Sequence, residues 1–386
     1  MTSQSCCLIS HSLQKGVGPA DANLLLAAEL TRRGYRVSLC GLNDDGASQL
    51  RTEEADADGM EIHALRIPKS LNWETRCKAF RGFLDEQQVS SAIIRFIPYS
   101  LNPKGIVWNA AQHLPKTLQA REVIWLMDEI WLDERTRNPK HRLTGALQRF
   151  AILRLLRRSP RRRVYTNNHF NAKTLQRFGI DAEPLRLFGN IPVAPADNGE
   201  WLYREFEKAG VPIAPANRGE WLILGNFGVF HSDWKPDAFF SALKDRARQH
   251  GTRVCMVGIG SLRSYEDHWR NVSDSWNEHF HFLHLGCRTE AEVSRFLQSV
   301  DFGLTSNPYY LVGKSGTCMA MLDHGLPILV PRISDQDEPA EFPASLVLRC
   351  GNRVEDDIFA ARPSRQPAPQ LPKFASQLIA AMTAPS

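Results

Sequence analysis

Short hydrophobic runs alternate along the chain with longer segments whose apolar positions recur at helical spacing. Such runs are typical of buried parallel strands, and the longer segments are typical of helices that cover a sheet. In the first half, a helix is expected at 23–33 and strands are expected at 7–9, 35–40, 61–65, 91–96, 122–126 and 163–166. The alternation predicts a doubly wound, Rossmann-like α/β domain with a parallel sheet.

The pattern stops at a proline-rich stretch, in which the sequence from Ile191 to Leu202 is echoed from Val211 to Leu222, and then begins again. The second series predicts helices at 237–250 and 290–299, with strands at 221–225, 253–258, 280–285, 302–304 and 328–330. We therefore expect two doubly wound domains facing a cleft. The expected parts are an N-terminal domain (1–190), a linker (191–218), a C-terminal domain (219–362) and a proline-rich segment with a final helix (363–386).

The composition limits the class of protein. The 386 residues are 43% hydrophobic and 23% charged, which is typical of a globular protein and long enough for two domains. The first ten residues have no basic segment and no long apolar segment, so a first strand is expected there rather than a signal peptide. The eight cysteines show no metal-binding spacing, and we expect reduced thiols in a cytoplasmic protein.

The net charge of +5 is unevenly distributed, because seven arginines lie between Arg149 and Arg163 among apolar residues. A basic amphipathic helix of this kind suits an anionic membrane surface, and its charges would also suit nucleic-acid phosphates. No nucleic-acid motif or aromatic stacking platform accompanies the cluster, so no nucleic acid is expected. Two interpretations stay open: peripheral membrane binding, and a helix that packs on the core with a solvated basic face.

The segment from Gly313 to Thr317 is the clearest candidate for ligand chemistry. Small and hydroxyl residues at a helix start leave backbone N–H groups for an anion, and Lys314 adds a positive charge. A nucleoside-triphosphate P-loop would need glycine at position 308, which is proline. A phosphate-bearing ligand is thus one hypothesis for Lys314, Ser315, Gly316 and Thr317, and a loop that only caps a core helix is the other.

The second half also carries a series of landmarks in a fixed order, and this series resembles the retaining glycosyltransferases of family 4, which have the two-domain GT-B fold. The matching segments are 222–227, 235–237, 255–261, 284–286, 296–304 and 320–327. The first half resembles the family through the Gly16 and Gly18 loop and through the segment from Met127 to Trp131. The resemblance implies a nucleotide diphosphate sugar on the C-terminal domain, a glycan or other acceptor on the N-terminal domain, and no metal or other cofactor.

The resemblance also implies roles for single residues. Stabilisation of the departing diphosphate falls to Lys235 and Lys314 and to the amides of Gly316 and Thr317. Further candidates for the donor site are Gly16, Gly18, Asn226, Gly258 and Ser315. In the N-terminal domain, Asp128 is a polar candidate for catalysis, and His11 and Trp131 are candidates for acceptor binding.

Departures from the family pattern keep other functions open. The two positions of the family's Glu-x7-Glu pair hold Val312 and Ala320, and Asp323 reaches the ribose only if the register shifts. Met127 stands where relatives have histidine. A catalytically silent GT-B protein that binds nucleotide or glycan as a partner subunit is therefore the alternative to a transferase. A sugar-nucleotide epimerase shares the fold, but no convincing pair of acidic groups for proton abstraction is seen.

Overall fold

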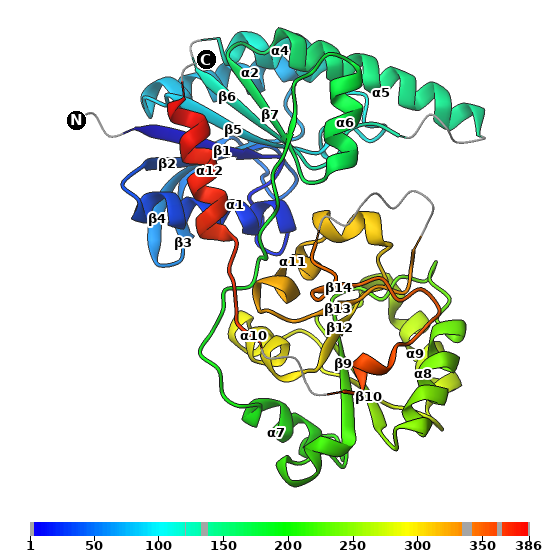
Figure 1. The fold of residues 1–386 in the computed structure, drawn as a ribbon. Helices are drawn as coiled ribbons and strands as arrows, with labels where there is room; N and C mark the ends of the chain where they lie inside the picture. The colour runs from blue at the N-terminus through cyan, green and yellow to red at the C-terminus, as the bar shows by residue number, and fades with distance from the viewer. Residues whose placement is uncertain (1–3, 120, 133–137, 334–341, 361–364, 385–386) are drawn as a thin grey trace. The chain divides into compact units, whose positions relative to one another are not determined.

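The computed structural model describes residues 4–119, 121–132, 138–333, 342–360 and 365–384. The chain divides into two compact units (Figure 1). Unit 1 comprises Met1–Leu187 and Leu371–Ser386, and unit 2 comprises Phe188–Gln370. Each unit is an α/β layer structure built on one parallel or mostly parallel sheet, which confirms the predicted fold class.

Unit 1 contains an eight-stranded sheet in the order β3-β4-β2-β1-β5-β6-β7-β8, parallel throughout except for the antiparallel pair β3 and β4. Its strands are β1 (Ser5–Ser10), β2 (Arg36–Asp44), β3 (Arg51–Ala57), β4 (Met60–Pro68), β5 (Ser91–Phe96), β6 (Glu122–Met127), β7 (Arg162–Thr166) and β8 (Glu183–Pro184). All six predicted strands are present. The edge strand β3 was not predicted, because its mostly polar, solvent-facing residues give no hydrophobic run.

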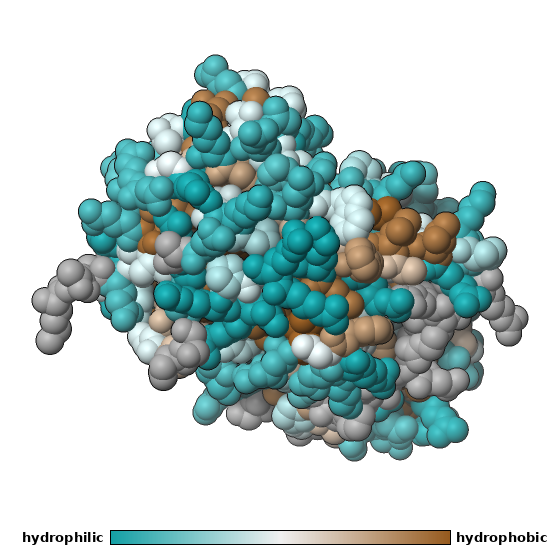
Figure 2. All heavy atoms as spheres, turned by 90° about the horizontal axis from the view of Figure 1, so that it is seen from above, coloured by the Kyte–Doolittle hydropathy of each residue, from teal (hydrophilic) through white to brown (hydrophobic). Residues whose placement is uncertain are grey.

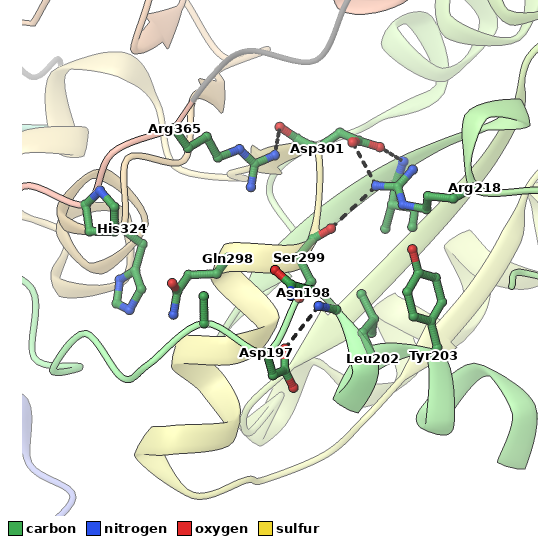
Figure 3. Close-up of a pocket in the computed structure, with 14 residues that line it drawn as sticks. Asp197, Asn198, Leu202, Tyr203, Arg218, Gln298, Ser299, Asp301, His324 and Arg365 are labelled. Carbon is green, nitrogen blue, oxygen red and sulfur yellow. Dashed lines mark hydrogen bonds and ion pairs between the residues drawn. The ribbon is translucent and has the colours of Figure 1, made fainter. Parts of the chain in front are cut away.

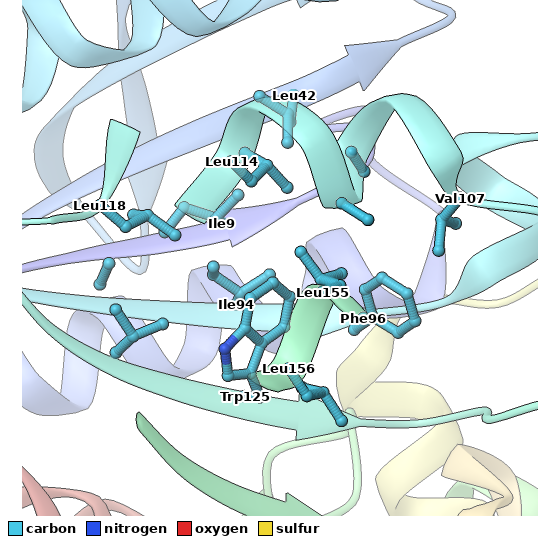
Figure 4. Close-up of a cluster of buried hydrophobic side chains, with 14 of the residues drawn as sticks. Ile9, Leu42, Ile94, Phe96, Val107, Leu114, Leu118, Trp125, Leu155 and Leu156 are labelled. Carbon is cyan, nitrogen blue, oxygen red and sulfur yellow. The ribbon is translucent and has the colours of Figure 1, made fainter. Parts of the chain in front are cut away.

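Helices cover both faces of this sheet (Figure 1). They are α1 (Gly18–Arg32), α2 (Trp73–Glu86), α3 (Pro98–Leu101), α4 (Trp108–Thr117), α5 (Pro139–Arg158), α6 (His169–Arg177) and α12 (Leu371–Thr383). The main core lies between the sheet and the helices α2, α4 and α5, with Trp125 and Phe96 packed edge to face at its centre (Figure 4). The C-terminal helix α12 packs beside α1 on the other face.

The apolar residues of helix α5 were expected either to contact a membrane or to pack on the core. Ile152, Leu153, Leu155 and Leu156 are all buried in the core of unit 1. The predicted membrane contact through these side chains is therefore wrong, because they pack on the sheet instead of facing outward. The core-packing alternative is confirmed for them.

Unit 2 contains a six-stranded parallel sheet in the order β11-β10-β9-β12-β13-β14. Its strands are β9 (Trp221–Phe227), β10 (Arg253–Ile259), β11 (His281–His284), β12 (Phe302–Leu304), β13 (Ile328–Leu329) and β14 (Val347–Leu348). Its α-helices are α7 (Glu200–Lys208), α8 (Asp237–Gln249), α9 (Glu266–Trp276), α10 (Glu290–Ser299) and α11 (Gly316–Asp323). Short 3₁₀ helices are η1 (Pro215–Glu220), η2 (Arg263–Tyr265), η3 (Tyr309–Lys314) and η4 (Asp356–Ile358). The predicted order of elements in the second half is confirmed.

The boundary between the units differs from the expected one. The stretch 191–218, expected as a linker, contains α7 and belongs to unit 2, since Trp201, Leu202 and Phe206 of α7 are buried. The final helix belongs to unit 1, where Phe374 and Leu378 are buried. Proline-rich composition marked the end of the first domain but did not show which unit the following helix joins.

All eight cysteines are free, as expected for reduced thiols. Burial raises the pKa of Cys7 and Cys255 to about 12, so both stay protonated at neutral pH. Among the described residues, no helix has the length and apolar content needed to cross a membrane.

Candidate functional site

Three turns of unit 2 meet at the carboxyl edge of its sheet. Gly228 follows β9, Gly260 follows the neighbouring strand β10, and the Gly228 N–H donates to the Ile259 carbonyl at 2.8 Å. Their φ angles are 84° and 99°. A Cβ on Gly260 would lie 3.4 Å from the Gly228 backbone, and a Cβ on Gly228 would lie 3.1 Å from Thr317 Cγ2. Glycine is therefore needed where these turns approach the start of α11.

The start of α11 is held by hydroxyl groups. The Ser315 Oγ accepts from the Cys318 N–H at 3.3 Å and lies 3.0 Å from the Thr317 hydroxyl. Asn307 donates to both Thr305 and Ser315. Because these bonds fix the first turn without using the Gly316 and Thr317 amides, the helix start leaves those N–H groups for an anion.

The two predicted lysines lie in different surroundings. Lys314 is half-buried directly before the cap of α11 and makes no ion pair with any residue that the structure describes. Lys235 is exposed at the far end of the loop that begins with Gly228. The pKa of His268 is lowered by burial first and also by the positive charge of Lys235, which places that lysine close to α9.

The loop from Gly228 to Lys235 is fixed by residues that were not predicted. The Ser306 hydroxyl accepts from the His231 N–H at 3.0 Å. Arg332 donates two hydrogen bonds to Asp233, at 3.0 and 2.9 Å, and a third to the Ser306 carbonyl. Gly228 and Gly260 each follow a predicted strand, so the sequence could have indicated turns at this edge of the sheet. The sequence around Ser306 and Arg332 contains no motif that predicts their contacts with the loop.

Three further donor-site candidates have structural contacts elsewhere in unit 2. Asn226 is buried in β9 and donates to the Leu304 carbonyl at 3.1 Å. A Cβ on Gly258 would lie 2.7 Å from His284 Cδ2, so glycine there makes room for a ring. Asp323, at the opposite end of α11 from Ser315, accepts from the Gly189 N–H at 2.9 Å. Their donor-binding roles stay predictions.

Unit 1 places its candidates at the carboxyl edge of its own sheet. Asp128 follows β6, pairs with the buried Arg95 of β5 at 3.9 Å, and its carbonyl accepts from Asn167 at 3.2 Å. Trp131 is partly buried against the core, with its ring edge-on to Phe178 at 5.6 Å. That packing limits how much of the indole face is left for a sugar.

The loop after β1 carries His11, Gly16 and Gly18. His11 is half-buried, and burial lowers its pKa. Gly16 has φ 85° and donates to Asp21 at 2.9 Å, and Gly18 begins α1. Both glycines have open space where a side chain would lie. The structure places the loop at the carboxyl end of β1, as a ligand-facing turn requires.

Asp44 at the end of β2 fixes this loop and was not predicted. Its side chain is fully buried and accepts from the Ser12 hydroxyl at 2.8 Å, the Leu13 N–H at 3.2 Å and Arg66 Nε at 2.7 Å. Burial acts to raise the pKa of Asp44, but the hydrogen bonds outweigh it and lower the pKa overall. The Asp44 carboxylate thus stays ionised and holds the β1 loop in place.

A polar cavity of about 440 Å³ lies at the other edge of the unit 2 sheet (Figure 3). Arg218 precedes β9 and Asp301 precedes β12, so the cavity is at the amino ends of these strands. Arg218 donates to Asp301 at 2.7 Å, and Arg365 donates to the Asp301 carbonyl at 2.5 Å. Arg218 thus pairs with the Asp301 carboxylate, whereas Arg365 bonds to backbone carbonyls. Because the cavity lies at the opposite edge of the sheet from Gly228, Gly260 and the start of α11, we do not take it as the candidate site.

No family model matches the chain, and no curated protein matches its sequence. Solved structures do match. The catalytic domain of starch synthase IV from Arabidopsis thaliana is similar with a TM-score of 0.55 and 10% identity, over 99% of this chain and 96% of that one. A glycosyltransferase from Rickettsia africae has a TM-score of 0.51 and 11% identity, over 86% and 80%. The UDP-GlcNAc 2-epimerase from Neisseria meningitidis has a TM-score of 0.51 and 8% identity, over 98% and 99%.

These similarities define the class of fold. At such low identity they show the two-domain α/β fold of GT-B glycosyltransferases and nothing of the chemistry. Both transferases and an epimerase share it. Among the described residues, no group of His, Cys, Asp and Glu side chains could hold a metal ion.

Proposed function

We propose that the protein is a glycosyltransferase that moves a sugar from a nucleotide diphosphate sugar to a glycan or related acceptor, with retention of configuration. One observation carries the proposal: Gly228, Gly260 and the capped start of α11 meet beside Lys314 at the carboxyl edge of a doubly wound sheet. This is where such sheets bind nucleotides. The starch synthase IV structure holds ADP and the epimerase structure holds UDP-GlcNAc, which supports a nucleotide diphosphate ligand for this fold.

The geometry suits stabilisation of a leaving group. When the bond between the sugar anomeric carbon and the phosphate oxygen breaks, negative charge grows on the diphosphate. The Gly316 and Thr317 amides, their neighbouring hydroxyls and Lys314 supply fixed donors and a positive charge. The acceptor oxygen forms the new bond to the anomeric carbon, and its proton passes to the departing diphosphate. We assign acceptor binding to unit 1 at His11 and Trp131, with Asp128 as the polar candidate for catalysis. No metal is assigned a role.

The test is an assay with a panel of nucleotide diphosphate sugars, with and without glycan acceptors. Release of nucleotide diphosphate that depends on an acceptor supports transfer. Binding measured by calorimetry without release in any combination would identify the silent GT-B protein instead. Exchange of the C2 hydrogen with solvent, followed by NMR without sugar transfer, would identify an epimerase.

A further inference from the structure

Helix α5 exposes a second apolar face, different from the one that packs on the core. Leu143, Leu147 and Phe150 are 65%, 46% and 59% exposed and follow one another at helical spacing. Trp108 of α4 is 48% exposed and packs edge-on against Phe150 with ring centroids 5.3 Å apart. These four side chains form a continuous apolar surface on the outer helical layer of unit 1.

Cationic side chains continue the same line along α5. Lys140 lies three residues before Leu143, and Arg154 and Arg158 lie four and eight residues after Phe150, all exposed. The Arg154 guanidinium carbon lies 5.8 Å from the centre of the Trp108 ring. We call Lys140, Leu143, Leu147, Phe150, Arg154 and Arg158, together with Trp108, the α5 stripe.

The charge around the α5 stripe has one sign. Residues 138–163 contain nine lysines and arginines and no aspartate or glutamate. Helix α4, which packs against α5, also contains no acidic residue. Figure 2 views this helical face from above, and apolar side chains gather toward its right-hand side, where Figure 1 places α5.

We propose that the α5 stripe docks the protein on an anionic lipid bilayer. Exposed Leu and Phe enter the boundary between headgroups and acyl chains, an indole suits the interface, and Lys and Arg on the same helix attract anionic headgroups. A protein partner is a poorer fit, because protein interfaces are depleted of lysine and need matching acidic groups. Of the apolar residues that first suggested membrane binding, only Phe150 belongs to the stripe, because Ile152, Leu153, Leu155 and Leu156 are buried.

Vesicle flotation of the full chain tests the docking surface. We expect binding to vesicles of phosphatidylcholine with phosphatidylglycerol, weakening with salt, and little binding to phosphatidylcholine alone. Leu147→Ser should weaken binding by about tenfold or more, because it removes a side chain that would be buried in lipid. Leu50→Ser is the matched control, since Leu50 is 44% exposed in the same unit but outside the stripe.

The same experiment can overturn the proposal. The proposal is contradicted if the wild-type protein does not bind anionic vesicles or binds neutral vesicles equally well. It is also contradicted if the Leu147→Ser variant binds anionic vesicles as well as the Leu50→Ser variant does. Sedimentation velocity supplies the competing outcome. A concentration-dependent dimer that Leu147→Ser disrupts, without vesicle binding, would assign the stripe to a second copy of this chain.

Discussion

Gly189 and Ala320 are in direct backbone contact, so that a Cβ atom added to Gly189 would lie 2.4 Å from the Ala320 Cα atom. Ala320 is fully buried in α11, and Val312 in the preceding turn is fully buried as well. In the glycosyltransferase family that the sequence resembles, these two positions carry the carboxylates of the Glu-x7-Glu pair. In this protein both positions are fully buried, and the Gly189 backbone lies directly against Ala320.

Ala320→Glu should therefore destabilise the protein instead of restoring a family feature. A larger charged side chain would be forced against the Gly189 segment, and its carboxylate would be buried without a partner. We expect a loss of about 3 kcal/mol or more in the free energy of unfolding. Urea denaturation followed by circular dichroism measures this loss.

Ala238→Glu is the matched control, because Ala238 is exposed in the first turn of α8. A glutamate at a helix start is favourable or neutral. If Ala320→Glu were as stable as Ala238→Glu, the packing around Ala320 would not exclude a glutamate. If Ala320→Glu also gained transfer activity, a carboxylate at this position would belong to the mechanism.

Lys314→Ala should weaken the binding of UDP or ADP by about tenfold or more, since a charge-assisted contact to phosphate is lost. Isothermal titration calorimetry at two salt concentrations measures the change. Lys244→Ala is the control, because Lys244 lies on α8 and pairs with the neighbouring Asp245 at 3.8 Å. Equal affinities for the two variants and wild type would remove Lys314 from the site.

The sequence predicted the parts of the structure that depend on local pattern. Buried strands gave hydrophobic runs, and the Ser315 cap with Thr317 was visible as a short motif. The polar edge strand β3 gave no such run. Gly228 approaches Thr317, and Asp44 bonds to the loop after β1, although both contacts join residues far apart in the chain. Neither contact can be predicted until the order of the strands in the sheet is known. Exposed Leu143 and Leu147 resemble core residues of any amphipathic helix until the structure shows which face is covered.

Gly228→Ala should weaken nucleotide binding more than it destabilises the fold. Alanine at φ 84° is strained, and its Cβ would push on the Thr317 side chain at 3.1 Å, where the candidate site is formed. Gly251→Ala carries similar backbone strain, at φ 62°, with no neighbour within 4 Å. Comparing melting temperatures with UDP affinity for the two variants separates strain from site distortion. If both variants lost affinity equally, Gly228 would have no specific role.

The Asp44 network should make stability depend on pH in one direction. Because the folded pKa of Asp44 is lowered below its ordinary value of 3.8, ionised Asp44 contributes stability above that value, and the contribution is lost as pH falls through the folded pKa. Asp44→Asn should cost about 3 kcal/mol at pH 7, because Arg66 loses a buried partner. Urea unfolding of wild type and variant from pH 7 to pH 3 should show this difference shrinking below about pH 4. If the difference in the free energy of unfolding between wild type and variant stayed constant from pH 7 to pH 3, the charge of Asp44 would not stabilise the loop that carries His11.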